Sequence, residues 1–163
     1  IYLKVIRGKT AALFSAATES GAVIAGAPEA HVAGLRDYGD ALGIAFQIAD
    51  DILDYGGTSA AIGKNTGDDF RERKLTLPVI RAVAAATPQE RAFWSRTIEK
   101  GDQRPGDLDE ALALLDRHGA LASTRATALG WADRAKAALA ALPASDLRDM
   151  LSDLADYVVA RLK

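Results

Sequence analysis

The sequence has 163 residues, of which 49% are hydrophobic, 26% charged and 6% aromatic, and it carries a formal net charge of −2 and no cysteine. This composition describes one ordinary globular domain with a real core. The near-neutral charge argues against nucleic acid or an anionic membrane as a partner, and no apolar run reaches the roughly 18 residues of a transmembrane helix. The lack of cysteine excludes disulfides and thiolate chemistry, and the cytoplasm is the expected compartment.

Alanine is abundant, and apolar residues recur at three- and four-residue spacing with hardly any strand-like alternation. This pattern predicts an all-α protein built as an antiparallel helix bundle. Thr87 to Glu90 has the layout of a capping box, and Ser145 is a suitable N-cap. The expected helices span residues 1–26, 29–55, 74–86, 88–101, 108–117, 120–142 and 146–162, and a polar, glycine-punctuated loop spans 58–69.

The first segment begins in the middle of a helical pattern, without Met, an N-cap or a signal-peptide layout. We therefore expect the natural protein to have a further N-terminal part that contributes to any site. Within the first helix, the apolar stripe is expected to run through Ile6, Leu13 and Ala17.

The second predicted helix carries an acidic stripe. Gln47, Asp50, Asp51 and Asp54 fall at i, i+3, i+4 and i+7, so a helix places them on one face, while the other residues of 44–53 are apolar. This helix is expected to be buried with its carboxylates facing an internal cavity. Carboxylates about 5 Å apart repel by roughly 3 kcal/mol at an effective dielectric near 20, so a positive group is expected beside them.

The chemistry of these side chains suggests which positive group that is. Carboxylate oxygens without histidine or cysteine select hard cations, and Mg²⁺ in particular combines one or two carboxylates with substrate phosphates. We therefore expect an Mg²⁺–diphosphate site. The alternative is an acidic surface face, which is disfavoured because acids near a helix C-terminus oppose the helix dipole.

Three lysines accompany the acidic stripe. Lys9, with Thr10 beside it, interrupts the apolar stripe of the first helix, so its ammonium is expected where a core side chain would lie; snorkelling to a nearby surface is the alternative. Lys64 lies in the glycine-bounded loop after the acidic helix, and Lys74 follows ten residues later. Metal on one side and ammonium donors on another are what a diphosphate requires.

Three motifs in this order resemble the trans-type polyprenyl diphosphate synthases, also called isoprenyl diphosphate synthases. They are residues 2–14 with Gly8-Lys9-Thr10, residues 43–55 with Phe46-Gln47 and the aspartates up to Asp54, and residues 63–78 with Gly63-Lys64-Asn65-Thr66-Gly67. The first motif is most similar to long-chain members that make octaprenyl to decaprenyl diphosphates for quinone side chains. The resemblance is specific over residues 1–80.

The resemblance implies the isoprenoid synthase fold, with residues 1–163 as the C-terminal part of a single helical domain. It implies a prenyltransferase that ionises an allylic prenyl diphosphate, adds isopentenyl diphosphate to the cation head to tail, and releases a proton, in successive steps. A homodimer and a lipid-like product are also implied. The implied residues are Asp50, Asp51 and Asp54 for Mg²⁺, with Asp50 touching the metal, Lys9, Lys64 and Lys74 for the allylic diphosphate, and Thr10 and Gln47 at the reacting end.

One departure from the family pattern is clear. The family's first Asp-rich motif and the Arg pair that follows it are absent from these 163 residues, since no Asp-Asp-x-x-Asp precedes Asp50 and Arg-Arg does not occur. The missing motif would bind two of the usual three Mg²⁺ ions and isopentenyl diphosphate. We therefore expect this polypeptide alone not to condense the substrates, even with Mg²⁺.

Two alternatives remain beside the synthase. A terpene cyclase shares the helical cavity, although its second metal motif normally mixes Asn, Ser and Glu. A non-catalytic subunit or helical adaptor would keep the fold without the chemistry. A His-Asp hydrolase is disfavoured because His31 and His118 are isolated in the sequence. The charges at 107–110 are interpreted as a solvated helix end.

Overall fold

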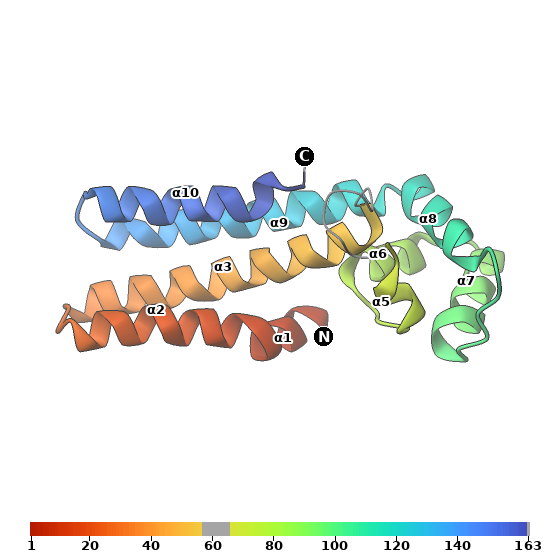
Figure 1. The fold of residues 1–163 in the computed structure, drawn as a ribbon, viewed down its shortest axis with the longest axis horizontal. Coiled ribbons are helices and arrows are strands. Elements are labelled where there is room, and N and C mark those ends of the chain that lie inside the picture. Colours follow the sequence, from red (N-terminus) through yellow and green to blue (C-terminus); the bar gives the residue numbers. More distant parts are fainter. Residues whose placement is uncertain (57–65, 163) are drawn as a thin grey trace. The chain divides into compact units, whose positions relative to one another are not determined.

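The structure is a computed structural model that describes residues 1–56 and 66–162 (Figure 1). Within these ranges every regular element is a helix, so the predicted all-α class is confirmed. None of the helices described there combines the length and apolarity that crossing a bilayer demands. The chain forms two compact units, one of Ile1–Ala49 with Ala126–Lys163 and the other of Asp50–Arg125. Lys64 lies outside the described residues.

The first helical run of the chain is interrupted by a wider turn. It consists of α1 (Tyr2–Ile6), the π-turn η1 (Arg7–Ala11) and α2 (Ala12–Ile24). A π-turn adds one residue to the helical repeat, so it rotates all residues after it relative to those before it. The prediction of one helix over 1–26 therefore has the right extent, but the regular repeat on which the predicted stripe was built ends at Ile6.

The buried face of this run changes position at η1. Ile6 is buried as expected, but Leu13 is 76% exposed and Ala17 is exposed as well, so the expected stripe is wrong beyond Ile6. After the π-turn the face that is buried or half-buried runs one residue later than predicted, through Phe14, Thr18 and Ala22.

The second helix, α3 (Glu29–Gly56), agrees with the predicted 29–55 and lies beside α2 in Figure 1. Two hydrogen bonds join the pair, from Thr18 Oγ1 to the Leu35 carbonyl at 2.6 Å and from Ser15 Oγ to the Arg36 carbonyl at 3.1 Å. The segment of α3 that precedes the acidic stripe is fully buried at Ile44. Most of the apolar surface of α3 therefore lies in the core, as the sequence predicts.

The first unit is completed by the part of α9 (Ala120–Ala138) from Ala126 on, the 3₁₀ turn η3 (Leu139–Ala141) and α10 (Asp146–Ala160). Helices α9 and α10 lie side by side in Figure 1, and Lys136 forms an ion pair with Asp156 between them. Ser145 caps α10 by accepting the backbone N–H of Arg148, as predicted. The buried hydroxyl of Tyr38 donates to the Leu151 carbonyl at 2.8 Å and so joins α3 to α10. Burial raises the pKa of Tyr38 to about 12.

The second unit is built from short helices around an apolar core. Phe70, Trp94 and Leu114 are among its buried side chains. The predicted 74–86 helix starts only at Leu77, because Pro78 is suited to a first turn and not to a helix interior. The helices of this unit are α5 (Asp68–Arg71), α6 (Leu77–Ala85), α7 (Pro88–Trp94), the π-turn η2 (Ser95–Glu99) and α8 (Asp107–Arg117).

The predicted capping box of α7 is confirmed. Thr87 Oγ1 accepts the backbone N–H of Glu90, and Glu90 Oε2 accepts that of Thr87 at 2.8 Å. Glu90 also contacts Arg117 Nη1 at 2.7 Å and His118 Nε2 at 3.0 Å. The pKa of Glu90 is lowered from 4.5 to about 2, mainly by the hydrogen bond from the Thr87 backbone N–H and next by the one from Arg117.

The interpretation of residues 107–110 as a solvated helix end is wrong for Asp107. This residue is 8% exposed, and its carboxylate accepts hydrogen bonds from both terminal nitrogens of Arg96, at 2.7 and 2.8 Å. The Arg96 guanidinium lowers the pKa of Asp107. Since a buried charge requires a partner, this pair is a structural contact inside the second unit.

Candidate functional site

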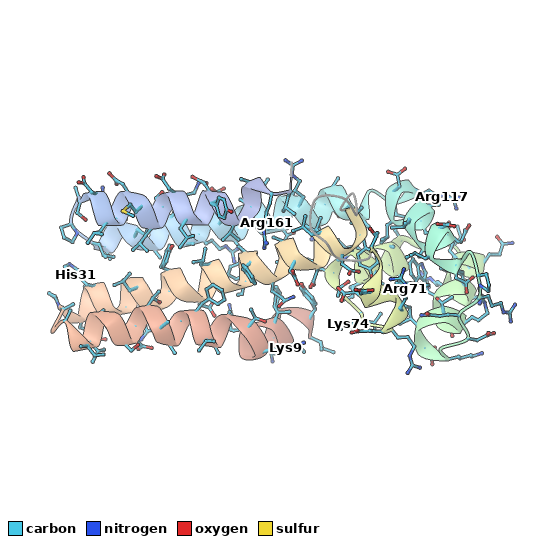
Figure 2. The ribbon with its side chains drawn as sticks, in the orientation of Figure 1. Lys9, His31, Arg71, Lys74, Arg117 and Arg161 are labelled. Carbon is cyan, nitrogen blue, oxygen red and sulfur yellow. The ribbon has the colours of Figure 1, made fainter. Side chains whose placement is uncertain are left out.

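The π-turn η1 presents the first two predicted site residues, Lys9 and Thr10. Thr10 is half-buried, whereas Lys9 is exposed (Figure 2). The expectation that the Lys9 ammonium occupies a core position is therefore wrong. The reason is the π-turn itself, because it breaks the regular repeat from which that position was deduced. An exposed ammonium keeps all its donors available to an anionic ligand.

Thr10 contacts Gln47, the first polar residue of the acidic stripe. Its hydroxyl donates to Gln47 Oε1 at 2.8 Å, and both side chains are half-buried. The two residues are separated by 37 positions in the sequence. The structure therefore brings into contact the two side chains for which the family resemblance implies a place at the reacting end.

Two glycines on α3 allow this contact. Gly39 and Gly43 precede Gln47 by two turns and one turn, so all three lie on one face of the helix. A β-carbon on Gly39 would lie 2.6 Å from the Phe14 carbonyl oxygen, and one on Gly43 would lie 2.6 Å from the Cα of Ala11. Both distances are below any real contact, so only glycine lets the backbones of α2 and η1 approach α3 this closely.

The aspartates continue the stripe along the last turns of α3. Asp51 is buried at 4% exposure, whereas Asp50 and Asp54 are half-buried. The apolar residues Ile48 and Ile52 on the same helix are buried, as the sequence predicts. These carboxylates are thus held partly out of water, where their charge interacts strongly with any cation.

Asp54 holds the start of α5. Its carboxylate accepts the backbone N–H of Asp69 at 3.0 Å, and its own carbonyl accepts the backbone N–H of Gly67 at 2.8 Å. Gly67 has φ +86, a left-handed conformation that glycine adopts without strain. Burial is the largest influence on Asp54 and raises its pKa, against the lowering effect of the Asp69 N–H.

Lys74 forms ion pairs with two neighbouring acids. Its Nζ lies 2.6 Å from Glu72 Oε2 and 3.0 Å from Asp69 Oδ1. These contacts, with Glu72 contributing most, raise the pKa of Lys74, so it is fully protonated. In the second unit the structure therefore links Lys74 to Asp54 through one residue, Asp69.

The aspartates do not form a chelating cluster. Among the described residues, no three histidine, cysteine, aspartate or glutamate side chains converge closely enough to hold a metal ion. Asp50 and Asp51 are consecutive and so diverge around the helix axis, and Asp54 is turned to the Asp69 N–H. The donor chemistry still fits Mg²⁺, because this ion commonly takes one or two protein carboxylates and completes its shell with water and phosphate oxygens.

Sequence reasoning missed several residues that contact the predicted site residues within each unit. Asp69 lies within the third motif, residues 63–78, but no role was predicted for it. Its position five residues before Lys74 could have indicated that the two side chains pair. Gly39 and Gly43 were also missed, although glycines four residues apart inside an apolar helix indicate a close backbone approach.

Known proteins resemble the chain over most of its length. Residues 1–115 match the family model described as Polyprenyl synthetase. Octaprenyl diphosphate synthase from Haemophilus influenzae is 41% identical over 160 residues, which cover 98% of this chain and 48% of that protein. The chain therefore spans about half the length of the curated relatives it matches.

Two solved structures share the fold. The decaprenyl diphosphate synthase from Rhodobacter capsulatus superposes with a TM-score of 0.94 at 70% identity, over 99% of this chain and 50% of that chain. A polyprenyl synthase from Caulobacter crescentus, complexed with calcium and isoprenyl diphosphate, gives a TM-score of 0.93 at 51% identity, over 99% of this chain and 49% of that chain. Together with the family match, which includes every predicted site residue, these similarities show that the chain belongs to the polyprenyl synthetase family.

Proposed function

We propose that the protein is a prenyltransferase that lengthens an allylic prenyl diphosphate with isopentenyl diphosphate. The observation that carries the proposal is the Thr10–Gln47 hydrogen bond, followed along the same helix by the half-buried Asp50, in a chain of the polyprenyl synthetase family. The names of the relatives support a long product, octaprenyl in Haemophilus influenzae and decaprenyl in Rhodobacter capsulatus. We propose a product of this class, serving as a quinone side chain.

The reaction begins with loss of diphosphate from the allylic substrate, in which the carbon–oxygen bond breaks and its electron pair leaves with the diphosphate. The double bond of isopentenyl diphosphate then forms the new carbon–carbon bond, and a proton leaves the adduct. Lys9, Lys64 and Lys74 are proposed to bind the diphosphate and balance the charge that grows on it. The calcium and isoprenyl diphosphate bound by the Caulobacter crescentus relative support a ligand of this chemistry.

Thr10 and Gln47 are proposed to face the allylic cation. Hydroxyl and amide oxygens carry partial negative charge, and their hydrogen bond holds both dipoles in place before the reaction starts. Buried apolar neighbours such as Ile48 provide no nucleophile that would capture the cation.

Asp50, Asp51 and Asp54 are the residues proposed to hold Mg²⁺. When bound, the ion would neutralise the departing diphosphate as a Lewis acid. The carboxylates are held partly out of water on α3, which strengthens their attraction for a divalent cation. Because they do not converge, we propose that each ion takes one or two protein oxygens and not a full protein shell.

The test is a prenyl-chain elongation assay with the natural full-length protein. It combines isopentenyl diphosphate, an allylic diphosphate and Mg²⁺, and the products are separated by chain length. Gln47→Leu is expected to lower kcat by on the order of 10²-fold, the usual cost of removing one preorganised dipole. If the wild-type protein forms no prenyl product, the proposed function is rejected. If Gln47→Leu forms product as fast as wild type, the role of Gln47 in the reaction is rejected.

A binding measurement separates the synthase from a non-catalytic adaptor. A non-hydrolysable allylic diphosphate analogue is expected to bind in the presence of Mg²⁺, and chelation of the metal is expected to weaken binding. An adaptor that lost the site would not bind the analogue, whether Mg²⁺ is present or not. The 163-residue chain alone is expected to bind the analogue without elongating it, because the first Asp-rich motif is absent from these residues.

We also propose that the protein assembles as a homodimer. Leu13, Val23 and Ile24 on α2 are between 59% and 87% exposed, which supports an apolar contact surface. Leu13→Glu is expected to shift the natural protein from dimer to monomer in light scattering. If Leu13→Glu keeps the molar mass of a dimer, the exposed apolar face of α2 is not the dimer contact.

A further inference from the structure

Arg7, the first residue of η1, joins three helices. Its Nε donates to both carboxylate oxygens of Asp40 on α3, at 2.9 and 3.2 Å. Its guanidinium carbon lies 5.8 Å from the ring centroid of Trp131 on α9, and Arg134 stacks on the same ring at 4.4 Å. These contacts join the start of the π-turn to α3 and α9.

The contacts of η1 with α3 extend along two turns of that helix. Asp40, Gly43 and Gln47 fall at i, i+3 and i+7, so they share one face. Arg7 contacts the first of them and Thr10 the last, and Ala11 packs against the glycine between them. The π-turn is therefore attached to α3 at both ends of the segment that carries Lys9.

A π-turn requires such support. It is a rare, locally unfavourable geometry that persists where tertiary contacts hold it, and it is frequent at functional sites. An exposed ion pair alone contributes little. Here one guanidinium contacts both carboxylate oxygens and also an aromatic ring, so its orientation is fixed from two directions.

We propose that Arg7 is a positioning residue, which acts through Asp40 and Trp131 to hold η1 in the register that presents Lys9 and Thr10. Arg7 touches no reacting group in this role. The inference rests on the proposed function for its kinetic consequences, whereas its consequence for the π-turn is independent of that function.

The experiment compares Arg7→Gln with Arg36→Gln in the natural full-length protein. Arg36 is a matched control, because its side chain is 45% exposed against 50% for Arg7, and it also joins α3 to the first helical run, through Glu19 on α2 at 3.7 Å. Arg7→Gln is expected to raise amide hydrogen exchange at residues 8–12 by about tenfold or more, whereas Arg36→Gln leaves it unchanged. Unchanged exchange in Arg7→Gln, or an equal rise in both variants, overturns the proposal.

The kinetic arm distinguishes positioning from general support. A misplacement near 1 Å lowers turnover by up to about 10²-fold, so Arg7→Gln is expected to lower kcat tenfold or more while the KM for isopentenyl diphosphate stays within twofold. Arg7→Lys keeps the charge opposite Asp40 but not the planar guanidinium, so it is expected to recover part of this loss. Arg7→Gln with Asp40→Asn is expected to be no worse than Arg7→Gln alone. A loss that appears in KM only, or no rescue by lysine, contradicts the assigned role. If the wild-type protein forms no prenyl product, the proposed function fails and the exchange result alone decides this inference.

Discussion

The hydroxyl of Thr10 donates to Gln47 Oε1 at 2.8 Å, which joins the π-turn η1 to the turn of α3 that leads into Asp50. Each side chain thereby fixes the orientation of the other. A change at either residue should therefore affect both dipoles that we propose to face the cation.

Thr10→Val tests this coupling, since valine keeps the shape of threonine and removes the hydroxyl. Turnover in the elongation assay is expected to fall by on the order of 10²-fold, because the Thr10 dipole is removed and the Gln47 amide loses the hydrogen bond that fixes its orientation. Thr10→Ser keeps the donor and is the control, with turnover expected within a few-fold of wild type. Equal turnover of the valine and serine variants would remove this hydrogen bond from the chemistry.

Gly43→Ala should destabilise the protein by about 1–3 kcal/mol or more, the usual cost of overpacking. The added methyl group would lie 2.6 Å from the Ala11 Cα, which is backbone and cannot rotate away. The measurement is urea unfolding of the natural full-length protein, together with turnover, which should fall as η1 moves away from Gln47.

The matched control for this change is Gly130→Ala in the interior of α9. Nothing lies within 4 Å of the added methyl group at that position, so alanine should stabilise the helix by up to about 1 kcal/mol. Opposite signs for the two substitutions are expected. If Gly43→Ala and Gly130→Ala both stabilised the protein, the close contact between Gly43 on α3 and Ala11 in η1 would be refuted.

Asp54 can be tested for its structural role separately from metal binding. Asp54→Ala leaves the Asp69 N–H without its acceptor and should cost about 1–3 kcal/mol of unfolding free energy in the absence of Mg²⁺. Asp54→Asn keeps an acceptor oxygen and removes the charge whose burial raises the pKa of this group. It should therefore be at least as stable as wild type without metal, and any Mg²⁺-dependent rise in melting temperature should shrink. Equal losses in both variants would contradict the hydrogen bond.

Glu90 should make the second unit acid-sensitive. Its pKa is lowered from 4.5 to about 2 in the folded protein, so the folded state holds the ionised form more strongly than the unfolded chain does. This stabilisation is complete above about pH 4.5 and is lost as the pH falls towards 2. The stability difference between wild type and Glu90→Gln is therefore expected to be larger at pH 5 than at pH 2.5.

Chemical unfolding at the two pH values measures this difference. Glu110→Gln is the control, because Glu110 is an exposed acid on the neighbouring helix α8. Its effect on unfolding free energy is expected to be small at both pH values. A Glu90→Gln difference that does not change with pH would show that the carboxylate is not held as described.

The all-α class, the extents of most helices, the caps at Thr87 and Ser145 and the acidic stripe could be predicted from the sequence alone, whereas α5 and the start of α6 at Leu77 could not. The capping box at Thr87 and the N-cap at Ser145 involve residues three positions apart, so the pattern itself contains both partners. The stripe from Gln47 to Asp54 likewise follows from the helical repeat, and its apolar neighbours are buried because that is the favourable state of such side chains in water. The family resemblance rests on the same local motifs and is confirmed by the match of residues 1–115.

Only the tertiary structure decided the geometry of η1. The π-turn that moves the buried face from Leu13 to Phe14 is held by contacts with Asp40, Gly43 and Gln47 on α3. Two of these contacts join residues 33 and 37 positions apart, and the glycine spacing indicates a close approach without indicating which backbone segment approaches. The exposure of Lys9 follows from that turn, and the hydrogen bond from the Asp69 backbone N–H to Asp54 likewise joins residues 15 positions apart in the sequence. The periodicity of a sequence reports only the local conformational preference of one segment. The positions of Lys9, Phe14 and Asp54 depend instead on the free energy of packing one segment against another.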